Sequence, residues 1–238
     1  MIEFFFRPFL TAFSVTVSVL ILFLSVVRFS PFLEEQRQRW FRLGGVAILI
    51  GFMVAFLLED RLIMTAPLWG LCIGAFFVFG FGIWDDLFNL SWKAQVFFQI
   101  MLALLIFLFG VRILYITNPF GGIWPLFSEA SFVPAFLVGL AWLLLVMNAL
   151  NWLDGLDGLC GGVSLIALLT IFFLSLKPEV NQPAFAIIAA IGVGSVLGSL
   201  VFNLPPARIF AGPRGSMFLG FLLVFLATAA GTKIATAL

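Results

Sequence analysis

Residues 148–164, NALNWLDGLDGLCGGVS, contain the side chains of this sequence that are best suited to chemistry. Asp154 and Asp157 are spaced i, i+3, as are Asn148 and Asn151, so each pair shares one face of a helix or helical turn. The glycines around the acids allow irregular backbone or close backbone approach. A charged side chain at membrane depth costs about 2.5–3.5 kcal/mol, so these acids indicate a functional site. The alternative is a solvated interhelical loop rich in turn residues.

A second acidic pair, Asp85 and Asp86, follows an apolar stretch that ends FGIW. Adjacent carboxylates repel each other unless a cation lies between them. Mg²⁺ suits such a pair because it takes oxygen ligands and shares them with phosphates, and Mn²⁺ is a second candidate. Asp154 and Asp157 could complete the site. The alternative is that Asp85 and Asp86 only cap a solvated loop.

A third polar segment, NLPPARIFAGPRGSMFLGF, covers residues 203–221. Arg208 and Arg214 offer contacts to a phosphate. Gly215 and Ser216 lie where the next helix is expected to begin, and a helix N-terminus attracts anions. An ordinary basic loop with a Gly/Pro turn is the alternative interpretation.

The composition indicates a polytopic membrane protein in a single integral membrane domain, 1–238. Of 238 residues, 63% are hydrophobic and 10% are charged, well below the quarter typical of soluble domains. The net charge of +1 gives no case for a nucleic-acid partner. The absence of histidine excludes His-based triads and His-ligated zinc. We expect no cleavable signal peptide, and we expect Cys72 and Cys160 to be free buried thiols.

Apolar segments of about 20 residues are long enough to cross a bilayer. The sequence contains about eight, at 8–29, 43–58, 66–84, 94–116, 132–150, 158–176, 184–203 and 216–235. It therefore predicts an all-α, polytopic transmembrane helix bundle.

Loop charges predict the orientation of this bundle. With eight spans the loops form two sets, and one is richer in basic residues: Arg37, Arg39, Arg42, Lys93, Arg208 and Arg214, with Arg28 at a helix end. The positive-inside rule places this set in the cytoplasm and both termini outside. The same set contains all four motif acids, which predicts a polar site at the cytoplasmic face. A transporter would more often place acids near the bilayer midplane, so a transporter or flippase is the weaker alternative.

Four stretches together resemble the polyprenyl-phosphate N-acetylhexosamine-1-phosphate transferases (glycosyltransferase family 4). They are LGGVAI (43–48), GIWDDLFNLSWKAQVFFQ (82–99), NALNWLDGLDGLCGGVS (148–164) and NLPPARIFAGPRGSMFLGF (203–221). The resemblance runs from about residue 35 to 221. Its details are more similar to the UDP-GlcNAc:undecaprenyl-phosphate GlcNAc-1-phosphate transferases than to phospho-MurNAc-pentapeptide translocase.

The resemblance implies transfer of a HexNAc-1-phosphate from a UDP-HexNAc to undecaprenyl phosphate, giving a lipid-linked diphosphosugar and UMP in cell-envelope polysaccharide synthesis. The implied location is the bacterial inner membrane, where membrane lipid surrounds the chain, and a homo-oligomer is left open. The implied site residues fall into three overlapping sets: catalytic Asp85, Asp86, Asp154 and Asp157; metal-binding Asp86, Asp154 and Asp157; and substrate-binding Lys93, Asn148, Asn151, Arg208, Arg214, Gly215 and Ser216.

Two departures from the family pattern bear on activity. The family usually has Gly-Asp-x-Gly-Ser, where this chain has Gly-Pro-Arg-Gly-Ser with Pro213 at the acidic position. The family also has a later histidine-bearing loop, and this chain has no histidine. The alternative function is therefore a catalytically weakened or inactive homologue, or a fragment, that only binds nucleotide sugar or lipid phosphate.

Overall fold

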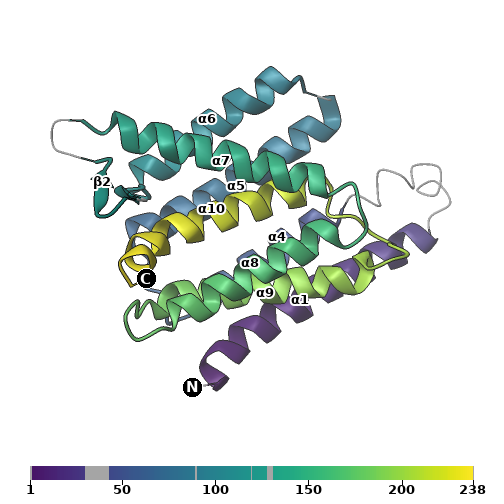
Figure 1. Ribbon diagram of the computed structural model, residues 1–238. Coiled ribbons are helices and arrows are strands. Elements are labelled where there is room, and N and C mark those ends of the chain that lie inside the picture. Colours follow the sequence, from purple (N-terminus) through teal and green to yellow (C-terminus); the bar gives the residue numbers. More distant parts are fainter. Residues whose placement is uncertain (1, 30–42, 89, 119, 128–130, 238) are drawn as a thin grey trace.

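The computed structural model describes residues 2–29, 43–88, 90–118, 120–127 and 131–237 (Figure 1). These residues form eight helices and one two-stranded hairpin: α1 (Ile2–Phe29), α4 (Gly44–Leu57), α5 (Ala66–Phe88), α6 (Trp92–Leu108), β1 (Tyr115–Thr117), β2 (Ile123–Pro125), α7 (Val133–Leu153), α8 (Leu159–Ser175), α9 (Pro183–Asn203) and α10 (Gly212–Ala237). The predicted all-α bundle is confirmed, and so are the two free, buried thiols of Cys72 and Cys160.

Five helices, α1, α5, α7, α9 and α10, are long and apolar enough to cross a bilayer. Helices α4, α6 and α8 are apolar but shorter, with 14, 17 and 17 residues. At 1.5 Å per residue they are roughly 21–26 Å long, slightly less than a hydrocarbon core of about 30 Å. The chain is a multi-pass membrane protein.

Successive helices run in alternating directions, so their loops collect at two ends of the bundle (Figure 1). One end, which we call the motif end, contains the start of α4, the α5–α6 junction, the α7–α8 loop and the α9–α10 loop. The opposite end contains the start of α1, the α4–α5 loop, the β1–β2 hairpin and the α8–α9 loop. The chemistry-bearing motifs are thus far apart in sequence but share one end.

Helices α9 and α10 form the centre of the bundle. Helix α9 packs against α1, α4 and α8, and α10 packs against α4, α5, α7 and α8. In their most apolar windows 78% of the residues are buried, against 17% in α1. Large side chains such as Leu22, Phe97 and Leu145 stay exposed on the outer helices, where lipid can cover them. The core therefore fixes the two helices that flank the α9–α10 loop.

The span predicted at 94–116 is wrong at its C-terminal end. Helix α6 ends at Leu108, and Gly110 follows with φ +89 and donates its N–H to Phe107 O at 3.0 Å. Arg112 folds back so that Nε donates to the same carbonyl at 3.2 Å. Residues 115–117 then pair with β2 in an antiparallel hairpin. Hydropathy averaging hid this turn because the residues on both sides of it are apolar.

Candidate active site

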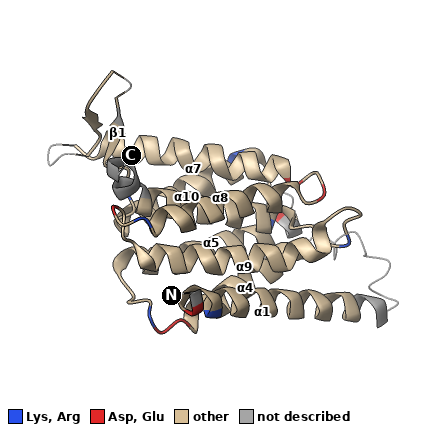
Figure 2. Cartoon of the chain, turned by 60° about the horizontal axis from the view of Figure 1, so that its bottom comes forward, with Lys and Arg blue, Asp and Glu red and all other residues tan. Residues whose placement is uncertain are grey.

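The predicted site residues lie at the motif end, where both acidic and basic residues occur (Figure 2). The described residues there are Asp85, Lys93, Asn148, Asn151, Asp154, Asp157, Arg208, Arg214, Gly215 and Ser216. Asp86 belongs to α5, but its side chain, like Arg37, Arg39 and Arg42, lies outside the described part of the structure. Lys93, Asp154 and Arg208 share one end of the bundle, as the loop charges require. That this end faces the cytoplasm stays a prediction.

The α7–α8 loop is fastened to the α9–α10 loop by hydrogen bonds across 45 to 50 residues of sequence. Asp157 Oδ2 accepts from Ala207 N at 3.0 Å. The next residue, Gly158, has φ +71, which a glycine adopts without steric cost, and it donates its N–H to Asn203 Oδ1 at 3.0 Å. Asn203 Nδ2 in turn donates to Ile209 O at 2.8 Å. The position of the Asp157 loop is therefore set by the α9–α10 loop.

The two amides of α7 connect it to its neighbours. Asn148 Nδ2 donates to Gln99 Oε1 on α6 at 3.1 Å and to Leu144 O at 2.7 Å. Asn151 Oδ1 accepts from the hydroxyl of Ser216, a fully buried residue on α10, at 3.1 Å. The structure thus uses these groups to hold three helices in register. Their binding of substrate stays a prediction.

Asp85 lies near the C-terminal end of α5 and orders the α5–α6 junction. Its Oδ1 accepts from Leu90 N at 3.1 Å and from Gln95 Nε2 at 3.4 Å. Its Oδ2 has no hydrogen-bond partner among the described residues. Lys93, on the first turn of α6, is exposed with Nζ 5.8 Å from the centroid of the Trp92 ring. This junction presents one carboxylate oxygen and one amine that no described residue hydrogen-bonds.

Arg214 connects the first turn of α10 to α5. Its Nε donates to Gly82 O at 3.4 Å, and a Cβ on Gly82 would come within 2.6 Å of Arg214 Cγ. The arginine side chain therefore lies across the helix that carries Asp85. Arg208, in the α9–α10 loop, is exposed. Both cations are placed at the end where a phosphate-bearing substrate is expected.

The start of α4 completes the motif end. Gly44 and Gly45 donate their N–H groups to Phe210 O and Ala211 O at 3.0 and 2.8 Å. A Cβ on Gly45 would lie 2.2 Å from Gly215 N, so only glycine fits this contact. The LGGVAI stretch thus fixes where α10 begins, and Gly215 serves close packing of the backbone.

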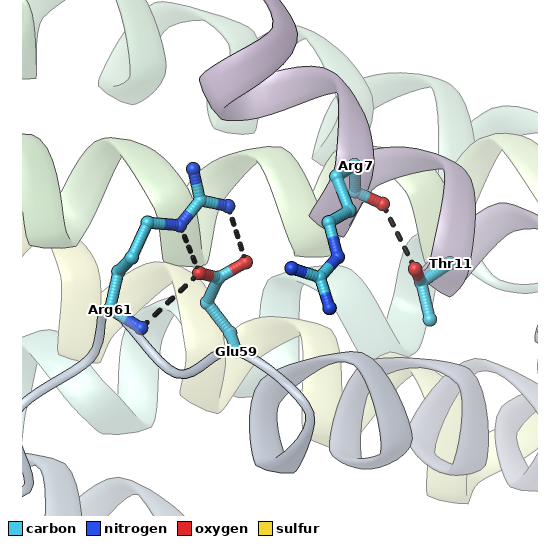
Figure 3. A network of polar contacts seen from close by, with 4 residues as sticks. All are labelled: Arg7, Thr11, Glu59 and Arg61. Atoms are coloured by element: carbon cyan, nitrogen blue, oxygen red, sulfur yellow. Dashed lines mark hydrogen bonds and ion pairs between the residues drawn. The ribbon is translucent and has the colours of Figure 1, made fainter.

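One acid at the opposite end, Glu59, is held differently (Figure 3). The Arg61 guanidinium donates to both Glu59 carboxylate oxygens, through Nε and through Nη2, the latter at 2.7 Å. This guanidinium lowers the pKa of Glu59 below its ordinary value of 4.5, and Arg7 nearby acts in the same direction. Arg61 also lies 4.1 Å from the centroid of the Phe4 ring and so joins this loop to α1.

The donor chemistry of the motif end fits Mg²⁺. Asp85 Oδ2 and Asp157 Oδ1 are oxygens that no described residue hydrogen-bonds. Among the residues described, however, no three His, Cys, Asp or Glu side chains form a group that could hold an ion. Mg²⁺ usually binds through one or two carboxylates together with substrate phosphates. Binding of Mg²⁺ at this end, and the convergence of all four acids on it, stay predictions.

Sequence reasoning missed three polar residues that build this end: Gln95, Gln99 and Asn203. The two glutamines are spaced i, i+4, and they support Asp85 and Asn148, respectively. Their shared face on an otherwise apolar helix was the available signal. Asn203 is the last residue of α9 and is 6% exposed. The sequence signal for Asn203 was its place at the end of a long apolar segment. A buried amide there needs hydrogen-bond partners, which indicates a contact to another part of the chain.

Comparison with known proteins decides the family. The family model for glycosyl transferase family 4 matches residues 68–231, most of the chain. The chain belongs to glycosyl transferase family 4. The matched region includes Asp85, the α7–α8 loop and the α9–α10 loop. Gly44 and Gly45, whose contacts complete the motif end, lie before it.

Relatives within glycosyl transferase family 4 carry related names. The chain is 33% identical over 185 residues to a probable undecaprenyl-phosphate N-acetylglucosaminyl 1-phosphate transferase of Bacillus subtilis, covering 78% of this chain and 50% of the relative. It is 30% identical over 208 residues to a decaprenyl-phosphate N-acetylglucosaminephosphotransferase of Mycobacterium leprae, covering 81% and 51%. A phospho-N-acetylmuramoyl-pentapeptide-transferase of Corynebacterium diphtheriae is 31% identical over 240 residues, covering 81% and 64%. The chain spans about half the length of the first two relatives.

Proposed function

We propose that this glycosyl transferase family 4 chain transfers GlcNAc-1-phosphate, or a closely related HexNAc-1-phosphate, from its UDP-sugar to undecaprenyl phosphate. The products are a lipid-linked diphosphosugar and UMP. The reaction takes place at the motif end, which faces the cytoplasm from the bacterial inner membrane. There a water-soluble nucleotide sugar meets a lipid-borne phosphate, and the product enters cell-envelope polysaccharide synthesis.

One observation carries the proposal: the α7–α8 loop, which bears Asp154 and Asp157, is hydrogen-bonded to the basic α9–α10 loop at the motif end. The Asp157–Ala207 and Gly158–Asn203 bonds join two loops, and the Ser216–Asn151 bond joins α10 to α7. Such fastening holds reacting groups in place before substrate arrives, which is what orientation of two substrates requires. The names of the relatives supply the substrate class.

The chemistry is a phosphoryl transfer. An oxygen of the lipid phosphate bonds to the sugar-bearing phosphorus of the UDP-sugar, and the bond from that phosphorus to the bridging oxygen breaks, releasing UMP. Asp85 either accepts a proton from the lipid phosphate as a general base or attacks first in a two-step variant. Lys93, Arg208 and Arg214 supply positive charge for the diphosphate.

Mg²⁺ would be held by Asp86, Asp154 and Asp157, and when bound it would neutralise charge on the diphosphate. The role of the chain is to hold the carboxylate oxygens in positions where they can contact the ion. Asp157 does so because Oδ2 is fixed by Ala207 N while Oδ1 stays unengaged by described residues. Mn²⁺ is an alternative ion with the same ligand preference.

A second candidate function is binding without efficient turnover, and Pro213 favours it. Proline in the first turn of α10 removes both a carboxylate and a backbone N–H from the anion-facing turn. The neighbouring Arg214 remains. Loss of part of the transition-state charge stabilisation lowers rate more than affinity, so we expect slow UMP release with measurable UDP-sugar binding.

The test measures UMP release from UDP-GlcNAc by the purified full chain with undecaprenyl phosphate and Mg²⁺, beside equilibrium binding of UDP-GlcNAc. We expect Pro213→Asp to raise the rate by about tenfold or more, because one preorganised charge is worth that much or more in phosphoryl and acyl transfer. Binding without UMP release from either protein would support the second candidate. Absence of both binding and UMP release would contradict both functions.

A further inference from the structure

We propose that Asn203 is a positioning residue that orients the Asp157 carboxylate, through two hydrogen bonds of its buried amide. The inference rests on the proposed function for its catalytic consequence. The structural part, that Asn203 holds the α7–α8 loop, can be tested separately.

The side chain of Asn203 is buried. Asn203 ends the apolar helix α9 and is only 6% exposed, so its amide is costly there unless it is hydrogen-bonded. Both of its groups have partners: Oδ1 accepts from Gly158 N at 3.0 Å, and Nδ2 donates to Ile209 O at 2.8 Å. The acceptor therefore bonds to the α7–α8 loop, and the donor bonds to the α9–α10 loop. An apolar side chain of the same size would leave both partners unsatisfied.

The hydrogen bonds of Asn203 act on both loops that contact the Asp157 carboxylate. Gly158 follows Asp157 directly, so the bond from its N–H to Asn203 fixes the backbone beside the carboxylate. Ala207, whose N–H holds Asp157 Oδ2, lies inside the turn that Asn203 closes onto Ile209. The Asn203 amide therefore fixes both the backbone next to Asp157 and the turn that contains Ala207 N–H, the donor to Asp157. Phe202 O supports the same turn by accepting from Arg208 N at 2.8 Å, so the turn can survive partial loss.

The orientation of the Asp157 carboxylate depends on these bonds. With Asn203 in place, one Asp157 oxygen is fixed to Ala207 and the other is left for substrate or its ion. Without it, Asp157 samples other orientations while the helices remain packed, since α9 is held by α1, α4 and α8. The loss should then appear in the α7–α8 loop and in turnover before it appears in folding.

The experiment compares amide hydrogen exchange of residues 155–160 in the full chain for wild type, Asn203→Ala and Ser195→Ala. Ser195 is the matched control: it is buried in the same helix about 12 Å before Asn203, and its hydroxyl donates to Ile191 O at 3.2 Å and to no other described residue. We expect about tenfold faster exchange in Asn203→Ala and no change in Ser195→Ala, since one net hydrogen bond is worth about that factor.

A second variant covers the case in which the alanine protein does not fold. Asn203→Asp keeps an acceptor for Gly158 N–H but loses the donor to Ile209 O. We expect protection of Gly158 to persist and exchange at 207–209 to accelerate. Equal protection of both loops in all variants would overturn the positioning role.

The catalytic consequence is tested by coupling to Asp157, with UMP release as the readout, in the Pro213→Asp background if that is faster. We expect Asn203→Ala to lower the rate in the parent and to have no further effect once Asp157→Asn is present. An equal fold-loss in both backgrounds would show that Asn203 acts independently of Asp157 and would overturn the proposal. If no parent protein releases UMP, the proposed function fails, while the exchange data still decide whether Asn203 positions the loop.

Discussion

Glu59 at the opposite end of the bundle is held in a different way from Asp85 and Asp157 at the motif end. At the opposite end, Glu59 is buried and receives both its side-chain contacts from one arginine, Arg61. At the motif end, Asp85 and Asp157 are held by backbone N–H groups and an amide, and no described cation pairs with either.

That difference distinguishes a structural ion pair from an acid that is available to a ligand. An acid paired with arginine has its charge compensated and its lone pairs used, so it can join α1 to the α4–α5 loop but has little capacity for a ligand. An acid oriented by neutral donors keeps its net charge. With one oxygen that no described residue hydrogen-bonds, it can still bind a cation or accept a proton.

The largest effect is expected at Asp85. Asp85→Asn should lower UMP release by about 10²–10⁴, the range for loss of a general acid–base group, because the amide can neither accept a proton nor attack. UDP-GlcNAc binding should change much less. The assay uses whichever parent, wild type or Pro213→Asp, is faster. A variant within a few-fold of its parent would remove Asp85 from the chemistry.

The next effect concerns the close contact between α4 and α10. Gly45→Ala places a Cβ 2.2 Å from Gly215 N, so the two helices must separate. We expect a loss of about 2 kcal/mol in unfolding free energy, typical of overpacking, together with slower transfer. Gly162→Ala in α8 is the control, because nothing lies within 4 Å of a Cβ there. Thermal unfolding in detergent checks both, and equal stability of the two variants would contradict the contact.

A smaller effect is expected at the opposite end. Glu59→Gln keeps the shape but removes the charge that Arg61 contacts, so it should cost about 1 kcal/mol of unfolding free energy. Transfer should stay within about twofold of the parent, because distant sites contribute independently. The measurements are the unfolding temperature and UMP release. A large loss of transfer would mean that the two ends are coupled.

The smallest effect is a pH dependence from the same pair. Because the Arg61 guanidinium lowers the pKa of Glu59, the pair's stabilisation is complete above the ordinary value of 4.5 and is lost as the pH falls through the lowered folded-state pKa. The wild type should therefore lose unfolding temperature faster than Glu59→Gln as the pH falls below 4.5. Parallel curves would show that the pair does not contribute.

Much of the fold could be predicted from sequence because hydropathy reports burial in lipid directly. The spans at 43–58, 132–150, 158–176 and 184–203 agree with α4, α7, α8 and α9 to within three residues at each end. The error at 94–116 arose where Gly110 turns the chain between apolar residues, which an averaged window cannot detect. Loop charge and motifs together predicted that the acids share one end, and they do.

The internal contacts of the site could not be predicted, because they join distant segments. Nothing near Asp157 in sequence points to Ala207, and the amide of Asn203 has no partner within its own helix. Ser216 suited anion binding by its place at a helix start, yet it is buried against Asn151. Residue type alone could not predict this contact, and substrate binding by Ser216 stays a prediction.

The most direct test follows labelled GlcNAc-1-phosphate from UDP-GlcNAc into solvent-extractable undecaprenyl lipid, with wild type, Asp157→Asn and Glu59→Gln at equal folded concentration. Each is also made in the Pro213→Asp background, so that a slow wild type does not hide the comparison. We expect label to enter the lipid with the parent and with Glu59→Gln at similar rates, and to fall by about 10² or more with Asp157→Asn. Undiminished transfer by Asp157→Asn, or no transfer by any of the six proteins, would contradict the assignment of the motif end as the transfer site.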